Sequence, residues 1–84
     1  MSIANKKESD YSFEVVKVLR TTRIDAKNRM DLWVVKWGRA GRPVLEKRRI
    51  WEREDGDRPT KAAGLDADDI RFIRDNYPDI INLL

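Results

Sequence analysis

Two runs within residues 30–51 place tryptophans and cations at the alternating spacing of β-strands: residues 32–37 (LWVVKW) and residues 44–51 (VLEKRRIW). We expect a hairpin that turns at residues 40–43 and pairs Trp37 with Leu45, because this pairing puts the odd-numbered side chains on one face. That face would carry Trp33, Val35, Trp37, Leu45, Lys47, Arg49 and Trp51. Aromatic rings beside cations suit single-stranded nucleic acid, since unpaired bases stack on rings and phosphates pair with Lys and Arg.

Positive charge is concentrated in the same part of the chain. The 84 residues carry a net charge of +3, but residues 15–50 hold eleven cations against three anions, a balance of +8 that leaves −5 for the rest. A basic sheet half and an acidic terminal half fit a polyanion-binding face that is backed by a non-binding face. Segregated charge also occurs in small proteins that only need to stay soluble, so charge alone leaves both interpretations open.

The residue types that the sequence lacks narrow the range of possible functions. The sequence has no Cys and no His, so it lacks thiolate chemistry, the commonest metal ligand and the commonest acid–base group near neutral pH. We therefore expect no enzyme activity, no metal and no cofactor. No apolar run is long enough to span a bilayer. We expect a cytoplasmic, nucleoid-associated protein with no membrane partner, or a nuclear protein in a eukaryote.

One small nucleic-acid-binding domain over residues 11–84 is expected. Residues 1–10 are polar and lack periodicity, which predicts a disordered N-terminal tail. β-branched and aromatic residues predict a first strand over residues 13–24. Strict alternation in that strand places on one face Phe13, Val15, Lys17 and Leu19, and on the other Glu14, Val16, Val18 and Arg20.

Turns separate the remaining strands. Residues 25–29 are expected to form a turn that leads into the tryptophan hairpin. Residues 52–59 are polar and contain Gly and Pro, which predicts a loop. Residues 60–65 are the candidate for a short, weak fourth strand.

The last element is a helix with a clear start. Asp66 is a good N-cap, and Asp69 follows near the positive end of the helix dipole. Pro78 disfavours helical geometry at Tyr77, so we expect a kink or a restart before Asp79. This region has more apolar side chains than one sheet face can cover, and an unburied apolar patch usually marks an interface. We expect a homodimer through Ile70, Ile73, Tyr77, Ile80 and Ile81; the alternative is a terminus folded onto its own sheet.

This order of elements resembles a known family. Five features are similar to the C-terminal domain of positive cofactor four and its small bacterial relatives: the stretch 48–51 (RRIW), the acidic loop that closes with Asp55-Gly56, the run 59–61 (PTK), Leu65 and the helix start 66–69 (DADD). The resemblance covers residues 13–84. Residues 61–65 (KAAGL) depart from the family, which usually has Lys-Gly-Ile and another small or apolar residue there.

The resemblance implies a fold, an assembly and a ligand. Members of this family form homodimers through their helices, and their twisted sheets hold single strands with little sequence preference. By position, Trp51 matches the stacking tryptophan at the end of the third strand, and Trp37 matches the aromatic near the end of the second. Lys61 matches a phosphate-contacting lysine before the fourth strand. With neighbouring cations, the predicted nucleic-acid-binding residues are Trp37, Lys47, Arg49, Trp51, Lys61, Arg39 and Arg58.

We therefore expect an α+β fold (ββββα), in which an antiparallel four-stranded twisted sheet is followed by one C-terminal helix, in a dimer. The expected function is single-stranded DNA binding with little sequence preference, as a transcription coactivator or regulator or as an accessory factor of DNA metabolism, with RNA as an alternative ligand. The rival is a protein-interaction module whose basic sheet docks an acidic segment of the transcription machinery. Trp37 and Trp51 also fit a core role, because large aromatics at strand ends are often packed.

Overall fold

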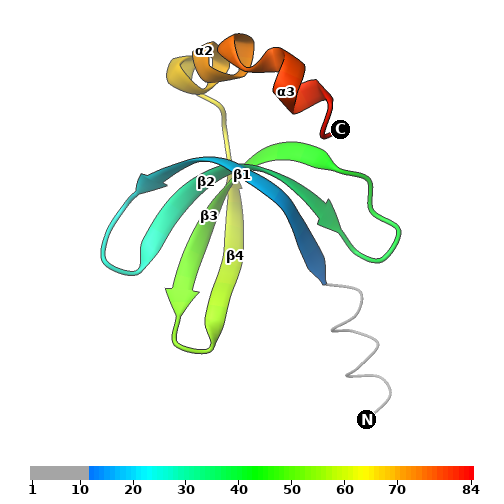
Figure 1. Ribbon diagram of the computed structural model, residues 1–84. Helices are drawn as coiled ribbons and strands as arrows, with labels where there is room; N and C mark the ends of the chain where they lie inside the picture. The colour runs from blue at the N-terminus through cyan, green and yellow to red at the C-terminus, as the bar shows by residue number, and fades with distance from the viewer. Residues whose placement is uncertain (1–11) are drawn as a thin grey trace.

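The computed structural model describes residues 12–84 and consists of one antiparallel sheet followed by two short helices. The strands lie side by side in chain order: β1 (Phe13–Arg23), β2 (Asn28–Trp37), β3 (Val44–Arg53) and β4 (Gly56–Ala63). The helices are α2 (Ala67–Asp75) and α3 (Tyr77–Ile81). Figure 1 shows a strongly twisted sheet with both helices on one side of it and the hairpin ends pointing away from them. The predicted α+β class and four-stranded antiparallel sheet are confirmed, whereas the predicted tail over residues 1–10 lies outside the described residues.

The pairing of β2 with β3 differs from the predicted one. Leu45 pairs with Val34 rather than with Trp37, and Asn28 pairs with Trp51. Odd positions of β2 therefore share a face with even positions of β3. The prediction of one odd-numbered face is wrong: Trp33 and Trp37 lie on one side of the sheet, and the other side carries Lys47, Arg49 and Trp51.

The loop after β2 explains this difference. Gly38 has a φ of 75°, a backbone conformation that favours glycine. A Cβ atom at Gly41 would lie 2.0 Å from the carbonyl oxygen of Trp37, so this glycine sits directly against the end of β2. The chain thus turns immediately after Trp37, which shifts the register of β3.

A single carboxylate organises the face that carries Trp33 and Trp37, here called the tryptophan face. Glu46 Oε2 accepts hydrogen bonds from the indole N–H groups of Trp33 (3.0 Å) and Trp37 (3.2 Å). Arg48 donates two hydrogen bonds to the same carboxylate and lies 4.8 Å from the centre of the Trp37 ring. Burial raises the pKa of Glu46, but the hydrogen bonds from Arg48 and Trp33 outweigh it and lower the pKa. The apolar core on this face consists of Trp33, Val35 and Ile50, with Trp37 packed against them.

Another carboxylate fixes α2 to the opposite face, here called the helix face. Asp66 and Asp69 form a capping box at the start of α2. The buried Asp69 carboxylate also accepts a hydrogen bond from Lys47 Nζ (2.8 Å) and pairs with Arg20. Both cations flank Leu32 in the sheet, so Asp69 lies over this buried leucine. Burial raises the pKa of Asp69, but the hydrogen bond from Lys47, the capping box and both cations lower it to about 2.

The first strand does not alternate strictly. Shifts in its pairing with β2 occur between Val15 and Lys17 and again between Val18 and Arg20. Each shift is a β-bulge, which inserts one extra residue and reverses the side on which the following residues point. Val15 and Val18, predicted on opposite faces, therefore lie on the same face.

The predicted loop over residues 52–59 is wrong, because β3 and β4 extend through most of it. Only Glu54 and Asp55 separate the two strands. Gly56 makes this tight turn feasible with a φ of 127°, which residues other than glycine rarely adopt. Pro59 lies within β4, an edge strand of the sheet, where a missing backbone N–H is tolerated.

The chain forms two helices where a single helix with a kink or restart was predicted. Asn76 ends α2, and its backbone N–H bonds to the carbonyl groups of Phe72 and Ile73. The new helix begins at Tyr77, two residues before the predicted restart. Pro78 lies in its first turn, where the missing N–H has no helical partner in any case.

Replacing Asp69 with asparagine should lower the free energy of unfolding by about 3 kcal/mol, because Lys47 and Arg20 lose their buried counter-charge. Urea denaturation at neutral pH measures this effect. The control is Asp66→Ala, which removes the N-cap but leaves Asp69 in place and should cost about 1 kcal/mol. Unchanged stability of Asp69→Asn would contradict the role of this carboxylate in docking α2.

Asp69 should also make the fold sensitive to acid. Its pKa is about 2 in the folded protein and about 3.9 in an unfolded chain, so its stabilisation is complete above the unfolded value and is lost as the pH falls toward 2. The Asp69→Asn variant should lose that part of the pH dependence. A remainder should persist because hydrogen bonds from Arg23 and Arg29 lower the pKa of Glu52 to about 2 as well.

Gly41→Ala should destabilise the protein by about 1 to 3 kcal/mol, because the added methyl group meets the backbone of Trp37. Gly64→Ala is the matched control, since a Cβ atom there has no neighbour within 4 Å, and it should be neutral or stabilise by less than about 1 kcal/mol. Thermal unfolding of both variants tests this difference. Equal stabilities would show that the loop is not held against Trp37.

Candidate nucleic-acid interface

Trp51 is the exposed tryptophan of this protein. Its side of the sheet is the helix face, but it lies near the end of β3, where the sheet has curved away from the helices (Figure 1), and it is 41% exposed against 2% for Trp33. Arg49 and Arg53 come two residues before and after it, so the indole stands between two guanidinium groups on the same side of the strand. Arg58 is its neighbour on β4.

The indole forms a wall of two open pockets. The first, of about 370 Å³, is basic and is lined by Asn28, Arg49, Trp51, Thr60 and Lys61. The second, of about 530 Å³, has mixed charge and is lined by Lys27, Trp51, Glu52, Arg53, Glu54 and Asp55. A flat aromatic ring with a pocket beside it can receive another flat ring by stacking.

Cations of the basic pocket are free to meet an anion. Within residues 12–84, Arg49 and Lys61 form no ion pair. The Nε of Arg49 donates a long hydrogen bond to Asn28 Oδ1 (3.4 Å), and the hydroxyl of Thr60 donates to the Arg49 carbonyl oxygen (3.0 Å). The Thr60 contact crosses the bulge between β3 and β4 and so fixes the backbone next to Lys61.

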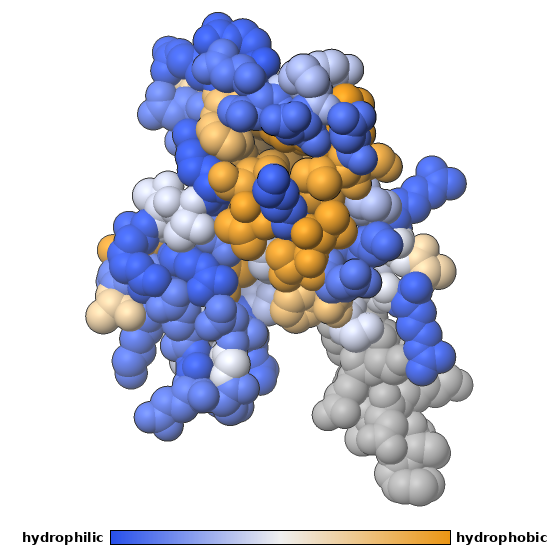
Figure 2. Space-filling view, in the orientation of Figure 1, coloured by the Kyte–Doolittle hydropathy of each residue, from blue (hydrophilic) through white to orange (hydrophobic). Residues whose placement is uncertain are grey.

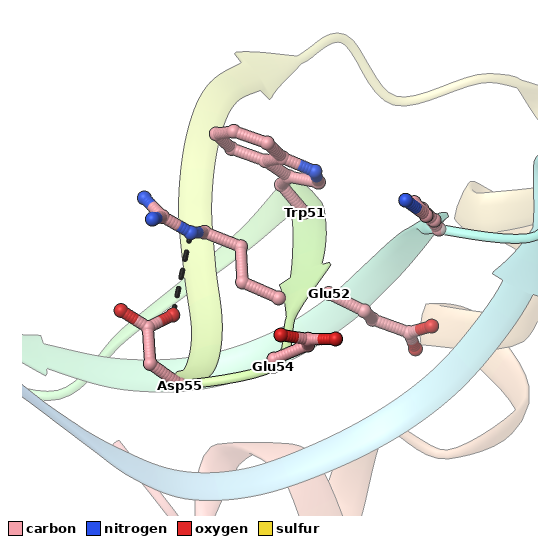
Figure 3. A pocket seen from close by; sticks show the side chains of 6 residues that line it. Trp51, Glu52, Glu54 and Asp55 are labelled. Atoms are coloured by element: carbon pink, nitrogen blue, oxygen red, sulfur yellow. Dashed lines mark ion pairs between the residues drawn. The ribbon is translucent and has the colours of Figure 1, made fainter.

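The mixed pocket contains an arginine stacked on the tryptophan. The guanidinium carbon of Arg53 lies 4.9 Å from the centre of the Trp51 ring, and Arg53 Nε pairs with Asp55 at 3.3 Å (Figure 3). Glu52 points away from the indole in the same view and binds Arg23 (2.6 Å) and Arg29 (2.8 Å). The ring is therefore exposed but held in orientation by its cation.

Only part of the predicted site comes together. Arg49, Trp51, Arg58 and Lys61 lie around the two pockets. Lys47 is half-buried and bound to Asp69, and this bond raises the pKa of Lys47. Trp37 packs on the tryptophan face, and Arg39 lies in the loop at the other end of β2.

Sequence reasoning missed the side chains that complete the pockets: Lys27, Asn28, Glu52, Arg53, Glu54, Asp55 and Thr60. Lys27 and Asn28 lie at the turn between β1 and β2, and only the pairing of Asn28 with Trp51 brings that turn to the site. Arg53 could have been found from its spacing, because residues two apart on a strand share a face.

Comparison with known proteins gave no relative: no family model, curated protein or solved structure matches the chain. The resemblance to positive cofactor four thus rests on short motifs and on the order of the elements. Neither of the two helices described is long and apolar enough to cross a membrane. Residues 12–84 contain no group of three or more acidic side chains placed to hold a metal ion.

Proposed function

We propose that this protein binds single-stranded DNA, with Trp51 as a stacking platform and Arg49 and Lys61 as phosphate contacts. The observation that carries the proposal is an exposed indole with unpaired cations beside it on the same surface. Stacking on an aromatic side chain contributes about 1 to 3 kcal/mol per base and requires a base that is free to leave its neighbours. A duplex keeps its bases stacked inside the helix and offers this site only its phosphates.

The composition of the site favours low sequence preference. Every base has a flat face to stack, and phosphate contacts carry no sequence information. Arg58 adds a cation beside Trp51 on β4, and Lys27 and Arg53 stand with three carboxylates in the mixed pocket. The resemblance to positive cofactor four suggests a role in transcription regulation or in DNA metabolism, and RNA is the other single-stranded ligand that this chemistry accepts.

Trp51→Ala should weaken the binding of a fluorescein-labelled dT oligonucleotide by about 1 to 3 kcal/mol while changing the free energy of unfolding little, because the side chain is exposed. Lys61→Ala should reduce the slope of log K against log salt by about 0.7, the value for one phosphate contact on a single strand. Lys17→Ala, an exposed cation on β1, is the control and should keep the slope.

Two outcomes would overturn this proposal. Duplex DNA of the same length bound as tightly as the single strand at moderate salt would leave only a basic patch. Unchanged binding by Trp51→Ala, together with competition by an acidic peptide, would favour the rival function, a module that docks an acidic protein segment.

We also propose that the protein forms a homodimer through its helices. Ile70 lies on α2, Tyr77 and Ile81 lie on α3, and Leu84 follows α3. All four side chains are exposed, Tyr77 to 57%. Figure 2 shows that apolar side chains gather below the helices over the middle of the sheet, whereas the hairpin ends are hydrophilic. Exposed apolar groups of this number favour an isologous contact with a second copy.

The structure changes the predicted membership of this interface. Ile80 is only 3% exposed, so it packs within its own chain. Ile73 is half-buried. The predicted interface residues that remain at the surface are Ile70, Tyr77 and Ile81.

Ile70→Asp should convert a dimer into a monomer in sedimentation experiments at micromolar concentration, because two buried carboxylates would face each other across the two-fold axis. Asn82→Asp adds the same charge at an exposed position after α3 and should leave the dimer intact. A wild-type protein that sediments as a monomer would refute the proposed dimer without affecting the DNA-binding proposal.

A further inference from the structure

We infer that the pocket lined by Lys27, Arg53 and Glu54 is a second nucleotide subsite, that it prefers guanine, and that Glu54 is the residue that determines this preference. The inference rests on the proposed function and goes beyond it, because stacking and phosphate contacts alone do not distinguish bases. It begins from the two pockets that share Trp51 as a wall. Consecutive bases of one strand can occupy the two sides of a single inserted ring.

The mixed pocket contains three carboxylates, and two of them already have cationic partners. Glu52 binds Arg23 and Arg29, and Asp55 binds Arg53. Within residues 12–84, Glu54 makes neither a hydrogen bond nor an ion pair. Figure 3 shows the Glu54 carboxylate across the pocket from the Trp51 indole. It is therefore the acceptor in this pocket that is available to the edge of a stacked base.

A carboxylate selects bases by the donors on their Watson–Crick edges. Guanine presents N1–H and the N2 amino group side by side, which match the two oxygens of one carboxylate. Adenine and cytosine each present one amino group beside an acceptor nitrogen. Thymine presents one N–H between two carbonyl oxygens, and a carboxylate repels both of these oxygens. Single-stranded bases are commonly recognised on this edge while they stack on an aromatic ring.

The cations of the pocket suit this arrangement. Lys27 and Arg53 stand on the same pocket walls as the carboxylates and can hold the phosphates of the bound nucleotide. A base that stacks on this side displaces the Arg53 guanidinium from the indole. The pair between Arg53 and Asp55 is exposed and weak, so it opposes this displacement little.

The test is a titration of the full-length protein with three labelled 12-nucleotide strands, (dT-dG)6, (dT-dI)6 and dT12, in lithium buffer, which disfavours guanine quadruplexes. Inosine carries hypoxanthine, a purine that keeps N1–H but lacks the N2 amino group, so it controls for stacking. We expect (dT-dG)6 to bind about five- to tenfold more tightly than (dT-dI)6, the lower end of the range for a two-hydrogen-bond contact. In Glu54→Ala this ratio should fall to about one.

The control variant is Glu14→Ala, which removes the same charge from an exposed position on β1 and should keep the guanine preference. Both variants lose one negative charge, so a general rise in affinity is expected and only the ratio between strands is diagnostic. Equal binding of (dT-dG)6 and (dT-dI)6 by the wild type, or a ratio that survives in Glu54→Ala, would overturn the inference. Either result leaves the proposed function standing if dT12 still binds and Trp51→Ala still weakens it, whereas failure to bind any strand refutes the proposed function itself.

Discussion

Burial of β2 on both of its faces is the constraint on which the rest of the structure depends. Five consecutive residues of this strand, from Asp31 to Val35, are buried. Its odd positions face the tryptophan core and its even positions face the helices. A shift of β3 by one residue would exchange the two sets of β3 side chains, placing Lys47 against the tryptophans and Glu46 beneath α2. Because both exchanges would leave charges without partners, the register is fixed. Trp51 is thereby directed to the helix face, near an end of β3 that the helices do not cover.

Two carboxylates, the half-buried Glu46 and the buried Asp69, join separate elements of this small domain. Glu46 joins two indole N–H groups to an arginine, and Asp69 joins a helix N-terminus to two cations of the sheet. A buried carboxylate is costly unless its oxygens are fully bonded. Among the residues described, no buried side-chain nitrogen or oxygen lacks a hydrogen-bond partner. Each carboxylate thus links separate elements through directional hydrogen bonds. An apolar contact at the same point would fix the relative position of these elements less well.

Local pattern predicted the elements but not their alignment. The β-branched runs located β1, β2 and β3, and the Asp66 cap located α2 within one residue. Periodicity within a strand does not show which residues of the next strand it pairs with, so the pairing of Trp37 could not be predicted from it. That pairing depends on the close approach of Gly41 to the Trp37 backbone, a contact that the sequence pattern does not reveal. The same holds for the site. Arg49 and Trp51 were predicted because residues two apart on a strand share a face, and Lys61 was predicted only from the resemblance to positive cofactor four, whereas Lys27 reaches the site from another turn.

The irregular edges of the sheet have a consequence for how copies of this protein meet. Each outer strand presents unpaired backbone groups that could extend the sheet into a neighbouring molecule. Here β1 is interrupted by two bulges, and β4 carries both Pro59 and a bulge. Neither β1 nor β4 offers a continuous ladder of hydrogen-bonding groups, so edge-to-edge pairing of sheets into fibres is disfavoured. The valines exposed on β1 therefore lie along an edge that is poorly suited to pairing with a neighbouring sheet.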